Sequence, residues 1–89
     1  MAWTVELAKS AEEDLDRLDR RQAERILVFL RDRVAKADDP RASGKQLSGV
    51  QREFWRFRVG DYRVLCRLED HRLVVLVVRI GHRRDVYDT

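Results

Sequence analysis

Three arginines, Arg56, Arg58 and Arg63, are the residues whose type and spacing most clearly indicate a functional site. Residues 54–68 read as two strands joined by a tight turn, and successive side chains of a strand point to opposite faces. The three arginines are therefore expected on one exposed face of the hairpin. Guanidinium groups held close together repel one another, so this face is expected to bind an anion. The alternative is that they are solubilising charges on the outside of a sheet.

The other row of the same hairpin is apolar and is expected to cover the core. Cys66 lies in this row, and it is the one cysteine of the sequence, which excludes an internal disulfide and a cysteine-based metal site. A single cysteine on an inward row usually behaves as a small hydrophobic residue. The row consists of Trp55, Phe57, Val59, Tyr62, Val64, Cys66 and Leu68.

Charge is distributed unevenly along the chain, whose formal net charge is +3. Residues 1–51 contain ten basic and ten acidic residues, whereas residues 52–89 contain nine basic and six acidic ones. All nine of these basic residues are arginines, which hold phosphate or carboxylate with a planar fork of donors. This distribution favours a nucleic acid or an acidic protein as partner. A GC-rich genome is the alternative source of so many arginines.

The composition indicates one folded domain spanning residues 1–89. Apolar residues make up 44% and charged residues 39% of the chain, which is typical of a globular protein. The N-terminus lacks the pattern of a signal peptide, and the longest apolar run, residues 73–78, is too short to cross a bilayer. We therefore expect a cytoplasmic protein without membrane contact. The sequence has no nucleotide-binding glycine motif and no zinc-ligand spacing, so neither a cofactor nor a metal is expected.

The first part of the chain predicts a strand and a helix. Residues 3–7 alternate as in a short strand, and Ser10 with Glu13 forms a capping-box pattern that would begin the helix. The helix would turn Asp14 towards water. Its apolar stripe consists of Ala11, Leu15 and Leu18.

A second helix is expected from Gln22 to just before Pro40, because the residue before a proline is disfavoured in helical geometry. Residues 38–52 then read as one long loop, anchored by an inward Leu47, and a loop of this length in a small domain is often functional. The helix stripe consists of Ala23, Ile26, Leu27, Leu30, Val34 and Ala37, with Phe29 at its margin.

The last strand, residues 73–80, is apolar almost throughout, which suits a strand covered on both sides. The alternation predicts that its even-numbered residues face the helices and that Arg79 faces the other way. The order β-α-α-β-β-β predicts an α+β domain. We expect a two-helix hairpin packed on one face of a mainly antiparallel four-stranded sheet.

Three stretches, taken with this order of elements, resemble a known family. They are residues 45–49 (KQLSG), 55–63 (WRFRVGDYR) and 81–87 (GHRRDVY), and they are similar to the RelE/ParE superfamily of bacterial toxins. The resemblance covers nearly the whole chain. It implies the toxin of a type II toxin–antitoxin pair. RelE-type members are endoribonucleases that cut mRNA in the ribosomal A site, whereas ParE-type members poison DNA gyrase.

The resemblance places RelE-type active-site residues at Arg56, Arg58, Arg63, Arg83 and Tyr87. The first two positions are commonly lysine in that type, and an arginine stays protonated where a lysine can act as a base. Arg56 and Arg58 are therefore expected to clamp phosphate and to stabilise the transition state. Arg63 would grip the scissile phosphate, Arg83 would assist the leaving group, and Tyr87 would stack on a base, orient the 2′-hydroxyl or transfer a proton.

His82 is a further catalytic candidate, because its unperturbed pKa suits acid–base chemistry at neutral pH; a structural histidine is the alternative. The residues expected to contact RNA around the site are Lys45, Arg52, Arg79 and Arg84, with contact to an antitoxin as the alternative for Arg79.

The resemblance thus implies a metal-independent, ribosome-dependent mRNA endoribonuclease as the leading function. Its partners would be the ribosome, mRNA in the A site and a cognate acidic antitoxin. Two alternatives remain open at this point. One is a gyrase inhibitor of the ParE type that acts by protein–protein binding, and the other is a catalytically inactive homologue that still binds an antitoxin.

Overall fold

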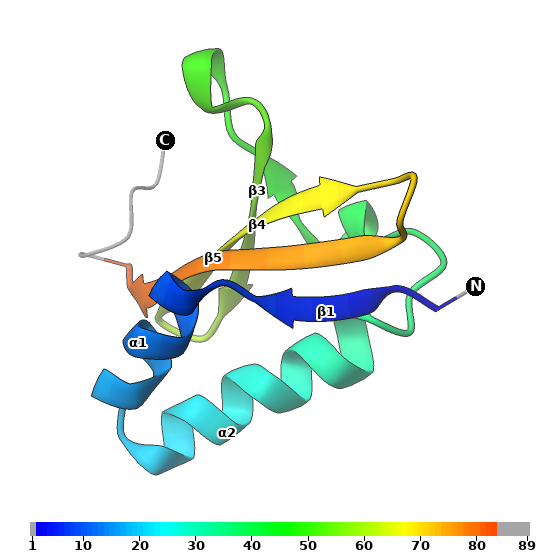
Figure 1. Ribbon diagram of the computed structural model, residues 1–89. Coiled ribbons are helices and arrows are strands. Elements are labelled where there is room, and N and C mark those ends of the chain that lie inside the picture. The colour runs from blue at the N-terminus through cyan, green and yellow to red at the C-terminus, as the bar shows by residue number, and fades with distance from the viewer. Residues whose placement is uncertain (1, 84–89) are drawn as a thin grey trace.

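A computed structural model describes residues 2–83 of the chain. The first half contains β1 (Thr4–Leu7), α1 (Lys9–Arg17), α2 (Arg20–Phe29) and a π-helical turn, η1 (Leu30–Val34). The second half contains η2 (Pro40–Ser43), β2 (Lys45–Gln46), η3 (Gly49–Gln51), β3 (Phe54–Val59), β4 (Tyr62–Glu69) and β5 (Val74–His82). The two α-helices lie together on one side of the sheet (Figure 1). In this part of the chain no helix has the length and apolar content that crossing a membrane requires.

The sheet has five strands in the order β1-β5-β4-β3-β2. β1 runs parallel to β5, and the remaining neighbours are antiparallel. The α+β class is confirmed, but the expected count of four strands is wrong by one. The extra strand, β2, pairs only Lys45 with Arg56 and Gln46 with Trp55. Two residues are too few to show the alternation by which a strand is recognised in a sequence.

The main core lies between the helices and the sheet, and the apolar row expected for the central hairpin is confirmed. Phe57 is fully buried, and its ring meets the edge of Phe29 from α2 at a centroid distance of 6.4 Å. Cys66 is also fully buried, and burial raises the pKa of its thiol far above the usual range. The helices contribute Ala11, Ile26, Leu30 and Val34 as fully or almost fully buried side chains.

The predicted faces of β5 are wrong in its first half. Val75 and Val77 belong to the core that faces the helices, together with Ile80. The register explains how an even-numbered residue can join two odd-numbered ones, because Cys66 pairs with Val77 while Leu65 pairs with Arg79. One extra residue is therefore inserted in β5 at this point, and such a bulge reverses the alternation.

The capping box expected at Ser10 and Glu13 is also wrong. α1 begins one residue earlier, with Ala8 at the N-cap and no side chain bonded there. Ser10 instead donates a hydrogen bond of 2.6 Å from its hydroxyl to the carbonyl of Val78 on β5. The start of α1 is thus held by the edge of the sheet, which local sequence patterns do not report.

Asp14, expected to face water, is buried with 7% of its surface exposed. Its Oδ2 accepts hydrogen bonds from the backbone N–H of Ile80 at 2.8 Å and from Arg79 Nε at 2.9 Å. β1 ends at Leu7, so the edge of β5 beyond it would otherwise leave this N–H without a strand partner. A carboxylate from α1 takes the place of the missing strand.

The second helix begins at Arg20 instead of Gln22, because Asp19 accepts a hydrogen bond from the N–H of Gln22 at 3.0 Å and caps it. Leu27, expected in the buried stripe, is 43% exposed. After Phe29 the helix widens into the π-helical turn η1. There the backbone N–H of Ala35 donates to the carbonyl of Leu30, five residues earlier, at 2.8 Å. Leu47 is buried as expected, though in a second small cluster with Leu65 on the face away from the helices.

Replacing Asp14 with alanine should lower the free energy of unfolding by about 2 kcal/mol, because it leaves the buried Ile80 N–H unsatisfied. Arg79→Gln should cost less than about 1 kcal/mol, because the Arg79 side chain is half exposed and its ion pair is screened by water. Urea unfolding followed by circular dichroism measures both. Equal costs for the two variants would contradict the role given to the backbone bond.

Candidate functional site

Arg56, Arg58, Arg63 and Arg83, which we call the arginine cluster, converge on the sheet face away from the helices. Arg58 and Arg63 are direct cross-strand neighbours in the β3–β4 pair. Gly81 is the partner of Arg63 in β5, so Arg83, two residues later, falls on the same face. The backbone N–H of Arg83 donates to the carbonyl of Asp61 at 2.8 Å and extends the ladder to this position.

Two members of the cluster are buried, which the expectation of an exposed face did not include. Arg56 is 4% and Arg63 is 8% exposed, whereas Arg58 and Arg83 are exposed. On the same face, the loop before β3 brings Leu47 against Leu65. Leu65 is also the direct cross-strand partner of Arg56.

The positive charges of the cluster act on one another. Burial, followed by the charges of Arg58 and Arg63, lowers the pKa of the Arg56 guanidinium. Burial also lowers the pKa of Arg63, with further contributions from Arg58 and Arg83, and Asp61 opposes this shift. A guanidinium stays protonated at neutral pH, so an anion bound among these groups would relieve their mutual repulsion.

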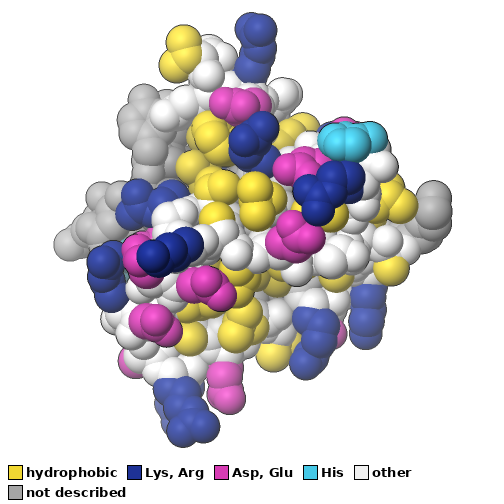
Figure 2. Space-filling model, in the orientation of Figure 1, with side chains coloured by type: hydrophobic (Ala, Val, Ile, Leu, Met, Phe, Trp, Pro, Cys, Tyr) yellow, Lys and Arg dark blue, Asp and Glu magenta, His cyan; other side chains and the backbone are white. Residues whose placement is uncertain are grey.

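Other arginines of the sheet and its turns form ion pairs. Arg67, Arg72 and Arg79 each form ion pairs with carboxylates, at 3.9 Å to Glu53, 2.6 Å to Glu69 and 2.9 Å to Asp14. On the face drawn in Figure 2, basic and acidic side chains are interspersed around apolar surface.

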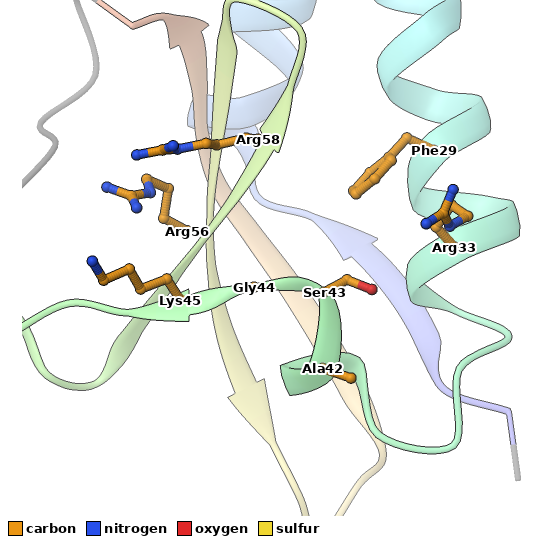
Figure 3. A pocket seen from close by; sticks show the side chains of 8 residues that line it. All are labelled: Phe29, Arg33, Ala42, Ser43, Gly44, Lys45, Arg56 and Arg58. Atoms are coloured by element: carbon orange, nitrogen blue, oxygen red, sulfur yellow. The ribbon is translucent and has the colours of Figure 1, made fainter.

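A cavity of about 500 Å³ opens beside the cluster at the edge of β3. Lys45 is the register partner of Arg56, and in Figure 3 the side chains of Lys45, Arg56 and Arg58 extend to the same side of the strands. Phe29 and Arg33 line the cavity from the helical side (Figure 3). The other lining residues are Ala42, Ser43 and Gly44.

Gly44 allows β2 to approach this closely. A Cβ atom there would lie 2.8 Å from Cε1 of the fully buried Phe57 and 3.2 Å from the carbonyl oxygen of Arg56.

Sequence reasoning did not identify Arg33 as part of the site. It has no distinguishing signal in the sequence, because exposed arginines are common on helices.

His82 does not join the arginine cluster. It pairs with Tyr62 in the register, and the two rings meet edge to face at 5.7 Å between centroids, with Tyr62 packed against the helix-side core. Arg79 is bound to Asp14 at the edge of β5. Both residues line a second cavity of about 380 Å³, between α1 and the end of β5.

The remaining predicted site residues lie apart or outside the described structure. Arg52 is exposed and follows η3, and its carbonyl accepts a hydrogen bond of 2.7 Å from Gln46 Nε2. It stands in the loop between β2 and β3, which projects from the sheet (Figure 1). Arg84 and Tyr87 fall outside residues 2–83. Within that range no three His, Cys, Asp or Glu side chains gather as metal ligands would.

Comparisons with known proteins find similarity to bacterial toxins. Residues 5–87 match the family model described as the ParE toxin of the type II toxin–antitoxin system parDE. The chain is 30% identical to Toxin RelG of Mycobacterium tuberculosis over 87 residues, covering 98% of each chain.

Solved structures give the same result. The RelBE2 toxin–antitoxin complex from Mycobacterium tuberculosis contains a chain with a TM-score of 0.87 and 28% identity, covering 96% of this chain and 95% of that one. The isolated RelE toxin of E. coli has a TM-score of 0.70 at 17% identity, covering 91% and 84%. At this lower identity the likeness shows the fold alone.

If the cluster is an anion site, phosphate should stabilise the protein beyond chloride of equal ionic strength. At about ten times its Kd, phosphate adds about 1.4 kcal/mol to the free energy of unfolding. Arg58→Gln should lose most of this increment, whereas Arg31→Gln, which removes an exposed arginine paired with Asp32, should keep it. Thermal unfolding in the two salts provides the measurement. The same increment in both variants would show a general salt effect and no site.

Proposed function

The chain belongs to the RelE/ParE superfamily of toxins of type II toxin–antitoxin systems, and on this premise we propose that it is an endoribonuclease. Its substrate is mRNA in the ribosomal A site, and cleavage there inhibits translation. The observation that carries the proposal is the arginine cluster, in which two guanidinium groups are buried beside two exposed ones. Such a site suits a phosphodiester held in a fixed orientation.

Cleavage of RNA without a metal makes three chemical demands. The 2′-hydroxyl must lose a proton, the negative charge on the five-coordinate phosphorus must be stabilised, and the leaving 5′-oxygen must gain a proton. The cluster meets the second demand, because preformed cations at the scissile phosphate need no rearrangement during the reaction. Arg63, which is buried and faces Arg58 across the strands, grips this phosphate. Arg56 and Arg58 stabilise the charge, and Arg83 assists the leaving oxygen.

Other residues would complete the RNA-binding surface. Tyr87 stacks on a base or orients the 2′-hydroxyl, and Arg84 and Arg52 contact the RNA backbone. Lys45 lies beside Arg56 and contributes charge at the cavity. His82 faces the other side of the sheet with Tyr62, so the proposal gives it no part in the reaction.

The proposal predicts mRNA cuts that depend on the cluster. Programmed ribosomes with a defined codon in the A site should yield cleaved mRNA, mapped by its new 5′ ends. Arg58→Ala and Tyr87→Phe should each lower the single-turnover rate by about a hundredfold. Arg31→Ala, an exposed arginine on η1, should cut at the unaltered rate. Undiminished cleavage by both site variants would remove the assigned site.

A gyrase inhibitor is the second candidate, and the observation that favours it is the match to the ParE family model. Such a toxin acts by binding another protein and needs no RNA chemistry. Accumulation of cleaved plasmid in the presence of gyrase, with intact mRNA on ribosomes, would establish this alternative. A homologue that binds an antitoxin and does neither would be inactive in both assays.

We further propose that a small acidic antitoxin inactivates the protein by covering the arginine cluster. The similar chain from Mycobacterium tuberculosis comes from a toxin–antitoxin complex, and a concentrated positive charge favours a complementary acidic partner. Apolar anchors on the partner would add affinity beyond the charge pairs.

Co-expression with the small protein encoded by the neighbouring reading frame should therefore give a purifiable complex and relieve toxicity. Arg58→Glu should weaken this complex by tenfold or more, on the order of 1.4 kcal/mol, because it places like charges opposite each other. Arg31→Glu serves as the matched control, because it reverses an exposed arginine of η1. Titration calorimetry gives both affinities. Equal affinities for the two variants would place the antitoxin elsewhere on the surface.

A further inference from the structure

The arginine cluster supplies no base for the first chemical demand. Removal of the 2′-hydroxyl proton requires a group that can exist without its own proton near neutral pH. A guanidinium stays protonated under these conditions, whereas an amine can release its proton. The four cluster residues can therefore bind and stabilise, but none of them can serve as the base.

We propose that Lys45 is the general base of this site. The inference rests on the proposed ribonuclease function and assigns the removal of the 2′-hydroxyl proton. Among the described residues that line the cavity beside β3, Lys45 carries the only amine. The other two lysines of the sequence, Lys9 and Lys36, are on α1 and just after η1, outside this lining.

The geometry places Lys45 opposite Arg56 and on the same side of the strands as the Arg56 and Arg58 side chains. Lys45 and Arg56 are opposite each other in the β2–β3 pair, where Cβ atoms lie about 5 Å apart. Figure 3 shows its side chain running beside Arg56, with its nitrogen on the same side as the Arg56 and Arg58 guanidinium groups. The proposal requires that a ribose whose 3′-phosphate is held by those arginines present its 2′-hydroxyl to this amine.

The backbone of Lys45 is held on both sides, as a catalytic group requires. On one side Gly44 packs against Phe57 at a distance that leaves no room for a Cβ atom. On the other side Leu47 is 2% exposed, and its N–H donates to Phe54 O at 3.0 Å. The two-residue strand is therefore a rigid support for this side chain.

The charged groups on the same side of the strands as the amine are Arg56 and Arg58 of β3 (Figure 3). Arg33 of η1 lines the cavity from the helical side. No carboxylate is present among the described residues of the lining. Among the described lining residues, Lys45 is therefore the group that can act as a base, whereas the Asp61 carboxylate acts on Arg63 from the β3–β4 turn.

The proposed step balances as an internal transfer of RNA. The neutral amine of Lys45 takes the 2′-hydroxyl proton, and the 2′-oxygen forms a bond to phosphorus. The bond from phosphorus to the 5′-oxygen breaks, and this oxygen takes a proton from water. The products are a 2′,3′-cyclic phosphate and a 5′-hydroxyl, and the ammonium of Lys45 returns its proton to the solvent.

Lys45→Arg tests the assignment because it keeps the positive charge and removes the base. On programmed ribosomes its single-turnover cleavage should fall by about a hundredfold or more, whereas its affinity for ribosomes carrying uncleaved mRNA should change less than about threefold. Lys36→Arg is the matched control, because Lys36 is an exposed lysine paired with Asp32 at 3.6 Å, and its rate should be unaltered. Circular dichroism confirms that each variant is folded.

A second variant restores the amine chemically. Lys45→Cys can be alkylated with bromoethylamine to give a side chain of lysine length with sulfur in place of one methylene. The native Cys66 is fully buried, so the reaction is confined to position 45. The alkylated protein should regain cleavage, and its pH–rate profile should move to lower pH because the sulfur makes the amine less basic.

Each outcome of these experiments decides the question. Cleavage by Lys45→Arg at close to the unaltered rate, or an alkylated protein whose pH–rate profile matches that of the unaltered chain, would overturn the role of Lys45 and leave the ribonuclease proposal standing. Absence of cleavage by the unaltered chain would overturn the proposed function and this inference together.

Discussion

Crowding of guanidinium groups on one sheet face is the constraint on which the rest of this structure depends. Arg58 and Arg63 face each other directly across two strands, and like charges in such a pair are destabilising. Burial of Arg56 and Arg63 adds to this cost because charges lose hydration. The helix-side core, with Phe57 and its fully buried neighbours, supplies the stabilisation that holds these strands together against the repulsion.

Two contacts, one at each edge of the sheet, position the ends of the site. At one end of the sheet, Asp14 satisfies the N–H of Ile80 where β1 has ended, and this keeps β5 ordered up to the point where Arg83 follows it. At the opposite edge, Gly44 lets β2 approach β3 and places Lys45 beside Arg56. At each edge a single specific contact stands where a full-length neighbouring strand would pair. The groups to which we assign a chemical role near these edges are Arg83 and Lys45.

The fold by itself does not distinguish the activities found in this superfamily, because function resides in the side chains that a fold carries. Lysine at the positions of Arg56 and Arg58 would combine phosphate binding and proton transfer in the same residues. Arginine at both positions restricts them to binding and charge stabilisation. The proton transfer then falls to a residue on a neighbouring strand, and in this structure Lys45 is suitably placed.

The sequence by itself determined the layers and the sheet faces of the central hairpin, because alternation over residues 54–68 leaves one arrangement that buries the apolar row. It also identified the arginines that share the other face. Only the tertiary structure decided that Asp14 is buried and that His82 faces away from the cluster. It also decided that a bulge at Val78 reverses the faces of β5, and that two residues form a fifth strand. These features depend on contacts between segments far apart in the chain, and a local pattern of polarity does not predict such contacts.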